Sequence, residues 1–348
     1  MAPLRILLQG LGGIGGVVAA RLVRAGYGPT LVTGNAEITV AIKQAGLRVK
    51  TLHEEFTVAA EAYTDLAQLP KDSRFDVSIM LMKANPVVAA AQKTLPFLVE
   101  DGYLLTCQNG MVEEAVAAVV GRQRVVAGIV GWGGTMHAPA VLEKTGPGAI
   151  HLGELDGSHS HRVRALASVL RYVSPVVVSG NIVGAMWAKL AINCMITAMG
   201  ALTGQTMGQM LRQKRARLAF LNIYREVVDT AEALGVELER IAVHPRLLYV
   251  AKDATWPTRL VKDSIARAIG LKYRRLKSSA LQSLQRGRPT EIDFLNGYVA
   301  TRAREAKIAV PFNRAVTRLI KEIEAGERQI QVDNVRDLFA VAQSYTET

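Results

Sequence analysis

The residues best suited to chemistry near the start of the chain are Gly10, Leu11, Gly12, Gly13, Ile14 and Gly15. In a G-x-G-x-x-G motif, the first glycine permits a tight turn and the second lets the backbone approach a pyrophosphate. The third glycine packs a helix against a strand. A glycine-rich turn with a purely structural role can have the same sequence. Here, however, the motif directly follows an apolar strand pattern and opens a helical one, as dinucleotide binding requires. The motif therefore predicts a binding site for NAD or NADP.

The end of the second expected strand bears on the choice of cofactor. An acidic residue there would bind the ribose of NAD, whereas a nearby arginine would favour the 2′-phosphate of NADP. The segment Leu31–Asn35 has neither. We therefore expect NADP(H), with Thr33 and Asn35 as hydrogen-bonding partners of the phosphate, and NAD(H) is not excluded.

Two further strand ends carry polar residues. Lys83 follows the strand pattern of residues 76–82, and Asn109 follows that of residues 103–107. Ligands of open α/β sheets bind beyond the carboxyl ends of the strands, so we expect Lys83 and Asn109 to face the nicotinamide and to bind the cofactor. The alternatives are that Lys83 is an ordinary surface lysine and that Asn109 belongs to an Asn-Gly turn.

In the second half of the chain, Lys189 and Asn193 interrupt an apolar helical pattern four residues apart, so they share one helix face. A lysine that releases its proton near neutral pH could protonate a carbonyl oxygen. A lysine that extends from the helix to water is the alternative. Glu291 follows Thr290, where we expect a helix to start. By pattern alone, this carboxylate is a helix cap.

The elements that must position these residues change character along the chain. Apolar runs at residues 4–9, 30–33, 76–82, 103–107 and 125–130 alternate with helical patterns, which indicates parallel βαβ units. From about residue 181 only long helical patterns follow. We expect residues 1–180 to form an NAD(P)-binding Rossmann domain and residues 181–348 to form a helical domain that holds the substrate.

Composition excludes several other classes of protein. The two cysteines form neither a disulfide framework nor a metal set, so we expect no metal and a reduced, cytoplasmic compartment. No secretory signal is visible, and the apolar stretch 190–202 is too short to span a bilayer. The net charge of +12 arises largely between Arg212 and Arg288. Without a nucleic-acid motif or a membrane segment, these charges indicate a solvated helix face or the attraction of an anionic cofactor and substrate.

The order of these motifs resembles the ketopantoate reductase family over nearly the whole chain. The resemblance rests on the glycine motif, the strand-end lysine, Asn-Gly-Met, K-L-x-x-N, S-S-x-L-Q, G-R-x-T-E-I-D-x-x-N-G and the closing A-V-P-F-N. It implies a Rossmann domain followed by a helical domain like the C-terminal one of 6-phosphogluconate dehydrogenase. It also implies NADPH-dependent reduction of 2-dehydropantoate to pantoate, a step of pantothenate biosynthesis.

The same resemblance implies roles for individual residues. Lys189 would be the catalytic lysine and Glu291 its partner. Asn109, Asn193 and Ser279 would bind the substrate, and Lys83 would lie between cofactor and substrate. Homodimerisation stays open.

The chain departs from the family pattern at several places. Thr197 and Ala198 stand where members carry Asn and Pro, and Ser283 stands where an acid is common. Residues 239–277 form a longer stretch than expected, and the usual arginine after the second strand is missing. These departures concern the selection of substrate and cofactor, so "2-oxo acid reductase" is the safer expectation. The alternatives are a dehydrogenase of another oxo or imino acid and a non-catalytic NADP-sensing protein.

Overall fold

The structure, a computed structural model, describes residues 4–241 and 244–346. The chain divides into two compact units. The sheet unit comprises Met1–Gln108 and Val112–Ile182, and the helical unit comprises Asn109–Met111 and Val183–Thr348. The three residues 109–111 thus belong to the helical unit although they lie in the first half of the chain. The functional roles assigned to residues 1–180 and 181–348 stay predictions.

The sheet unit is built on an eight-stranded sheet with the strand order β12-β11-β8-β7-β6-β1-β2-β5. Its strand pairs are parallel except for β11, which runs antiparallel to β8. The strands are β1 (Ile6–Gln9), β2 (Thr30–Val32), β5 (Ala62–Tyr63), β6 (Phe75–Met80), β7 (Leu98–Thr106), β8 (Val125–Val130), β11 (Ile150–Glu154) and β12 (Val176–Val178).

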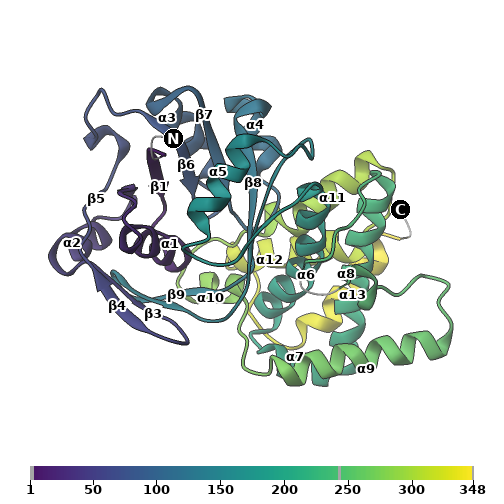
Figure 1. The fold of residues 1–348 in the computed structure, drawn as a ribbon. Coiled ribbons are helices and arrows are strands. Elements are labelled where there is room, and N and C mark those ends of the chain that lie inside the picture. The colour runs from purple at the N-terminus through teal and green to yellow at the C-terminus, as the bar shows by residue number, and fades with distance from the viewer. Residues whose placement is uncertain (1–3, 242–243, 347–348) are drawn as a thin grey trace. The chain divides into compact units, whose positions relative to one another are not determined.

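Helices alternate with these strands along the purple-to-teal part of the chain (Figure 1). They are α1 (Gly13–Arg24), α2 (Ala36–Ala45), α3 (Val87–Thr94), α4 (Glu113–Val120) and α5 (His161–Leu170). Strands β1 and β8 are buried along their whole length, as expected of strands in a mostly parallel sheet that is covered on both faces. The expected strands are confirmed as β1, β2, β6, β7 and β8, although β7 begins earlier than predicted, at Leu98.

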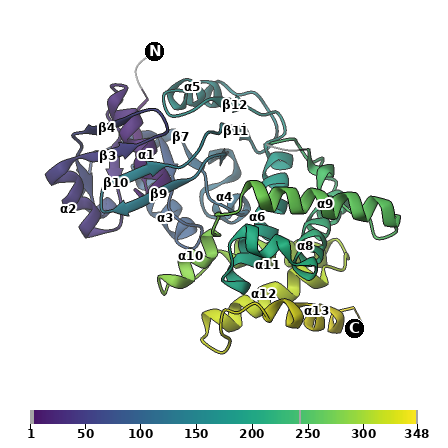
Figure 2. The same cartoon turned by 90° about the horizontal axis from the view of Figure 1, so that it is seen from below.

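A second, four-stranded sheet was not predicted. Its strands, in the order β4-β3-β10-β9, are β3 (Leu47–Lys50), β4 (Glu55–Val58), β9 (Gly134–Ala138) and β10 (Val141–Lys144). Figure 2 shows this small sheet beside α1 and α2. The strands are short, and β3 pairs in parallel with β10 some ninety residues later. Pairing over such a separation leaves no local pattern in the sequence.

The helical unit follows with α6 (Ile182–Thr203), α7 (Met207–Arg212), α8 (Lys214–Ala233), α9 (Trp256–Lys272), α10 (Ser279–Gln285), α11 (Asn296–Glu305), α12 (Pro311–Glu324) and α13 (Asn334–Ser344). Among the described residues, its core contains 36 buried hydrophobic side chains, drawn from all eight of these helices and from the turns between them. The predicted fold class, a Rossmann-like parallel sheet followed by a helical domain, is confirmed.

Helix α6 corrects one expectation from the sequence. The apolar stretch 190–202 is part of a 22-residue helix, which by length and composition alone could cross a membrane. However, 72% of its most apolar window is buried inside the protein. An apolar helix enclosed by other helices is typical of a protein core. The prediction that this apolar stretch is too short to span a bilayer is therefore wrong, and it is the burial of α6 that is typical of a core helix.

Two of the asparagines in the resemblance motifs form a buried polar network. Asn296 donates to the carbonyl oxygen of Cys194 at 3.3 Å and to Oδ1 of Asn313 at 2.9 Å. Asn313 in turn donates to the carboxylate of Glu226 at 2.8 Å. Glu226 also accepts the backbone N–H groups of Phe312 and Asn313. The network ties α6, α8, α11 and α12 together, so these motif residues have a structural role.

The prediction that a helix begins near Thr290 is wrong. Residues Ile292–Phe294 form a single 3-10 turn, η5, and α11 starts only at Asn296. Leu295 separates the two with a φ of −108° and a ψ of −103°, far from helical values. Glu291 precedes the turn, and its side chain makes no capping hydrogen bond. The structure therefore does not support the capping role for Glu291.

Candidate active site

The glycine loop between β1 and α1 is shaped by backbone contacts inside the sheet unit. Gly10 has a φ of +89°, and a Cβ there would overlap the backbone of Met82. A Cβ on Gly13 would overlap Gly134 of β9, and one on Gly15 would overlap the carbonyl oxygen of Gly10. These three positions have no space for a side chain because other parts of the protein occupy it.

Gly12 is the exception within the motif. A Cβ at this position would meet no atom within 4 Å. Gly12 precedes α1, whose first N–H groups have no partner inside the helix. This open face beside a helix N-terminus fits a pyrophosphate, since nothing in the protein itself requires glycine there. Leu11 differs again, because its side chain is buried in the core and only its backbone could contact a cofactor.

Beside the glycine loop lies a pocket of about 360 Å³. It is lined by Gln9, Gly10, Val32, Thr33, Gly34, Thr64, Asp65, Leu66, Met82, Pro86, Ala89, Ala90 and Lys93. Thr33 lines the pocket, and its role as a hydrogen-bonding partner of the cofactor phosphate stays a prediction. The predicted partner Asn35 does not line it, because its Oδ1 accepts the Ile38 N–H at 3.1 Å and caps α2.

Two charged residues of this pocket were missed by the sequence analysis. Lys93 comes from α3, and Asp65 precedes the 3-10 turn Leu66–Gln68. The Asp65 carboxylate accepts the N–H of Ala67 at 2.8 Å. Neither residue lies near the second strand in the sequence. The fold brings them there through α3 and through the pairing of β5 with β2.

The ends of β6 and β7 are held together by Gln108. Its amide donates to the carbonyl oxygens of Met80 and Met82, at 2.9 and 3.1 Å. Lys83 follows Met82 directly and is exposed. Gln108 thus fixes the strand end that carries Lys83 to the one that precedes Asn109. The sequence alone does not reveal this role of Gln108.

Residues 109–111 pack within the helical unit. The amide of Asn193 donates to Oδ1 of Asn109 at 3.5 Å, and Met111 donates its N–H to the carbonyl oxygen of Phe294 at 3.1 Å. Gly110 has a φ of +93°, and a Cβ there would overlap the same carbonyl group. The loop therefore brings Asn109 and Asn193 together beside η5, the turn that begins after Glu291.

Lys189 lies one helical turn before Asn193 on α6 and is half-buried. Glu291 is buried, with 8% of its surface exposed. A half-buried lysine on an apolar helix costs free energy of solvation unless it is paired or used. The structure therefore keeps Lys189, Asn193 and Asn109 as candidates on one helix face and its adjoining loop.

The serine pair before α10 divides into two roles. Ser278 is buried against Gly200 of α6, and its hydroxyl accepts the Leu281 N–H at 3.1 Å as the cap of α10. Ser279 is the first residue of α10 and is exposed. This leaves Ser279, the residue chosen from the sequence, available to a ligand.

Glu113 secures the start of α4, just after the 109–111 loop. Its carboxylate accepts the Thr106 hydroxyl at 2.9 Å and the Val112 N–H at 3.0 Å. Burial raises the pKa of Glu113 to about 7. The carboxyl group is therefore a buried anchor between β7 and α4 that titrates near neutral pH.

Over residues 4–241 and 244–346, no group of three or more His, Cys, Asp or Glu side chains is placed to hold a metal ion. The candidate residues themselves offer an ammonium group, a carboxylate, amides and a hydroxyl, from Lys189, Glu291, Asn109, Asn193 and Ser279.

Two family models match most of this chain. The model described as "Ketopantoate reductase PanE/ApbA" matches residues 6–157, and "Ketopantoate reductase PanE/ApbA C terminal" matches residues 181–324. Among curated proteins, the chain is 28% identical over 323 residues to the 2-dehydropantoate 2-reductase of Archaeoglobus fulgidus. That alignment covers 92% of this chain and 98% of the relative.

Solved structures show the same architecture. A PanE/ApbA family ketopantoate reductase from Ralstonia eutropha superposes with a TM-score of 0.78 at 26% identity, covering 93% of this chain and all of the other. The ternary structure of D-mandelate dehydrogenase with NADH and anilino(oxo)acetate gives a TM-score of 0.78 at 20% identity, covering 92% of this chain and 98% of that one. At 20% identity the second likeness shows the fold alone.

The open space at Gly12 generates a first prediction. Gly12→Val should abolish dinucleotide binding and leave the melting temperature nearly unchanged, because the new side chain would occupy the space expected for the pyrophosphate while its Cβ meets no protein atom within 4 Å. Fluorescence titration with NADPH, beside a thermal melt, measures both. Gly28→Val is the matched control, since a Cβ there also meets nothing within 4 Å. Wild-type affinity in Gly12→Val would remove this loop from the cofactor site.

Glu113 generates a second prediction, on pH. The folded chain holds the Glu113 proton more tightly than the unfolded chain, whose glutamates titrate near 4.5. The resulting stabilisation is complete below about pH 4.5 and is lost as the pH rises through about 7. The wild type should lose unfolding free energy as the pH rises from 5 to 8. Glu113→Gln should lose roughly 1–3 kcal/mol less than the wild type over the same range. Urea unfolding across this range tests it, with the exposed Glu100→Gln as control. Equal pH slopes for wild type and Glu113→Gln would contradict the assignment.

Proposed function

The chain belongs to the ketopantoate reductase family and is an oxidoreductase acting on CH–OH groups, and from this premise we propose that it reduces a 2-oxo acid with NADPH. The substrate we propose first is 2-dehydropantoate, the compound named in its curated relatives. The observation that carries the proposal is the contact of Asn109 with Asn193, one helical turn from Lys189. A protein that only senses a dinucleotide has no need of this cluster.

The proposed reaction needs a hydride and a proton. When bound, NADPH supplies the hydride to the carbonyl carbon of the 2-oxo acid. The ammonium group of Lys189 donates a proton to the carbonyl oxygen, which becomes the alcohol, and the neutral amine takes a proton back from solvent. Before the transfer, the same cation stabilises the negative charge that develops on this oxygen.

The substrate-binding residues supply hydrogen bonds of complementary kinds. The amides of Asn109 and Asn193 can donate to the substrate oxygens, and the exposed Ser279 hydroxyl can donate to its carboxylate. Glu291, buried just before η5, is proposed as the partner that orients Lys189 and the substrate. Lys83, on the exposed strand end after Met82, is proposed to contact the cofactor close to the substrate.

Support for NADPH comes from the pocket beside the glycine loop. Lys93 supplies a cation that the sequence lacks after the second strand, and Thr33 supplies a hydroxyl. Asp65 lines the same pocket and works against a 2′-phosphate, although its carboxylate already accepts the Ala67 N–H. The balance of these two charges decides the preference in this proposal.

A third prediction therefore concerns the cofactor. NADPH should bind more tightly than NADH, and Lys93→Ala should weaken NADPH severalfold while leaving NADH unchanged, because only NADPH carries the 2′-phosphate. Asp65→Asn should increase the preference for NADPH over NADH, because it removes a negative charge from the same pocket. Titrations of both cofactors against the three proteins provide the test. A tenfold preference of the wild type for NADH would contradict the proposal.

A fourth prediction concerns Lys189. Lys189→Ala should lower kcat for 2-dehydropantoate by about two to four orders of magnitude, the usual contribution of a positioned acid. NADPH affinity should barely change. Glu291→Ala should also lose activity, with a larger share of the loss in KM, and the double variant should lose less than the sum of both.

Steady-state kinetics with NADPH and a panel of 2-oxo acids, run beside thermal melts, decides between the roles. Lys214→Ala, an exposed lysine at the start of α8, is the control and should keep full activity. An active but less stable Lys189→Ala would remove this lysine from the mechanism. A wild type that turns over none of the 2-oxo acids would overturn the proposed function.

A further inference from the structure

A pocket of the helical unit is formed by α7 and by the C-terminal end of α9 with the turn that follows it. The pocket has a volume of about 400 Å³. Its lining residues are Thr206, Gly208, Gln209, Arg212, Gly270, Leu271, Arg274 and Arg275. None of them belongs to the site proposed for the 2-oxo acid or to the pocket beside the glycine loop.

The charge of this pocket is entirely positive. Three guanidinium groups line it and no carboxylate does. Acidic residues are absent from residues 157–225 and from residues 264–290, and the second of these segments has seven lysines and arginines. Within the part of the chain that the structure describes, none of the three arginines forms an ion pair with a carboxylate. Arg217, by contrast, pairs with Asp263 at 2.7 Å.

The walls of the pocket are fixed by close backbone packing. A Cβ on Gly208 would lie 2.7 Å from the Cα of Arg274, and one on Gly270 would lie 2.7 Å from the Cβ of Leu211. The N–H of Met207 donates to the carbonyl oxygen of Leu276 at 2.9 Å. These contacts hold α7 against α9 and the turn of residues 273–278. The arginine side chains therefore project from backbone that is held in place.

Three like charges on such a frame repel one another, and a multivalent anion between them relieves the repulsion. The planar guanidinium fork matches the oxygens of a phosphoryl group and can bind them in pairs. Thr206 and Gln209, which bond to each other at the start of α7, add polar groups to the same wall. The volume of about 400 Å³ suits a small phosphorylated molecule better than a single ion.

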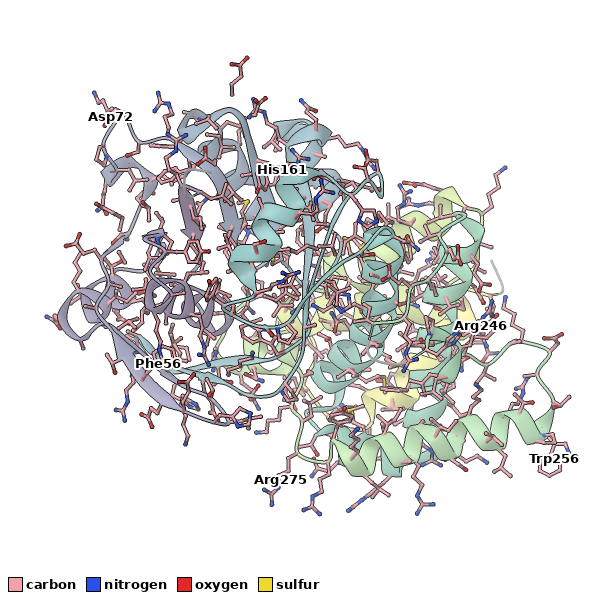
Figure 3. All side chains as sticks on the ribbon, in the orientation of Figure 1. Phe56, Asp72, His161, Arg246, Trp256 and Arg275 are labelled. Atoms are coloured by element: carbon pink, nitrogen blue, oxygen red, sulfur yellow. The ribbon has the colours of Figure 1, made fainter. Side chains whose placement is uncertain are left out.

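We propose that the α7–α9 pocket is a second anion site, which binds a compound carrying phosphoryl groups. The site is separate from the proposed active site, and its existence does not depend on the proposed reaction. The phosphoryl group could belong to a soluble compound or to a lipid headgroup. Leu271, which lines the pocket, and Trp256 at the other end of α9 are 60% and 74% exposed. Figure 3 shows Trp256 and Arg275 at the two ends of this helical segment.

The test measures binding directly, with NADP⁺ at saturation so that the glycine loop is blocked. Sodium pyrophosphate is titrated calorimetrically into the full-length wild type, into Arg274→Gln/Arg275→Gln and into Arg286→Gln/Arg288→Gln. The last variant loses the same charge from the same basic segment but outside the pocket. We expect the pocket variant to weaken binding at least tenfold and the control to weaken it less than twofold. In the wild type, pyrophosphate should also slow hydrogen exchange in residues 273–278.

A second arm identifies the source of the phosphoryl group. Vesicles of phosphatidylcholine with 30% phosphatidylglycerol are sedimented with the same three proteins. The site is assigned to a lipid headgroup if the wild type binds the vesicles but not pyrophosphate, and if the pocket variant loses vesicle binding. Pyrophosphate binding that depends on Arg274 and Arg275 assigns it to a soluble compound. Equal weakening in both variants, or no binding of either probe, overturns the proposal.

Discussion

The contact of Gly110 with the carbonyl group of Phe294 is the constraint on which the candidate site depends. With a φ of +93° and no room for a Cβ, residue 110 must be glycine for the loop to lie on η5. The hydrogen bond from Met111 to the same carbonyl holds the loop there. Asn109 thereby comes within reach of Asn193 on α6. Without this close approach, the polar groups of the loop and of α6 would not form one cluster.

The residues on either side of this loop are anchored within the sheet unit. Gln108 bonds the end of β7 to the end of β6, and Glu113 bonds the start of α4 to Thr106. Both side chains are buried, and both are saturated by protein groups. The same holds for Asn313 and Glu226 behind α6. Buried polar groups that satisfy one another specify a single geometry, which is what the catalytic role proposed for Lys189 requires of its surroundings.

Much of the fold could be predicted from the sequence because its signals are local. The glycine motif, strands β1, β6 and β8, and the change to helices near residue 181 follow from periodicity over short windows. The small sheet joins two short hairpins, β3–β4 and β9–β10, and their union could not be predicted because β3 and β10 pair across some ninety residues. The helix expected near Thr290 was wrong because the backbone of Leu295 breaks it after a single 3-10 turn.

The site was predictable only in part, for the same reason. Motif spacing pointed to Lys189, Asn193 and Asn109, and the structure brings the two asparagines into contact. Lys93 and Asp65 could not be found, because tertiary pairing alone brings them beside Thr33. Nor could the sequence distinguish Ser278, a helix cap, from Ser279. It also could not show that Asn35 caps α2 and does not line the pocket beside the glycine loop.

The most direct test of this account is the kinetics of Gly110→Ala. The substitution leaves Lys189, Asn193 and the glycine loop intact and disturbs only the approach of residues 109–111 to Phe294. We predict that kcat/KM for 2-dehydropantoate falls at least tenfold while the Kd of NADPH stays within about twofold of the wild type, roughly 1.4 kcal/mol or more of lost transition-state stabilisation. Gly146→Ala, where a Cβ meets nothing within 4 Å, controls for glycine replacement as such. An unchanged kcat/KM in Gly110→Ala would contradict the claim that this loop presents Asn109 to the substrate.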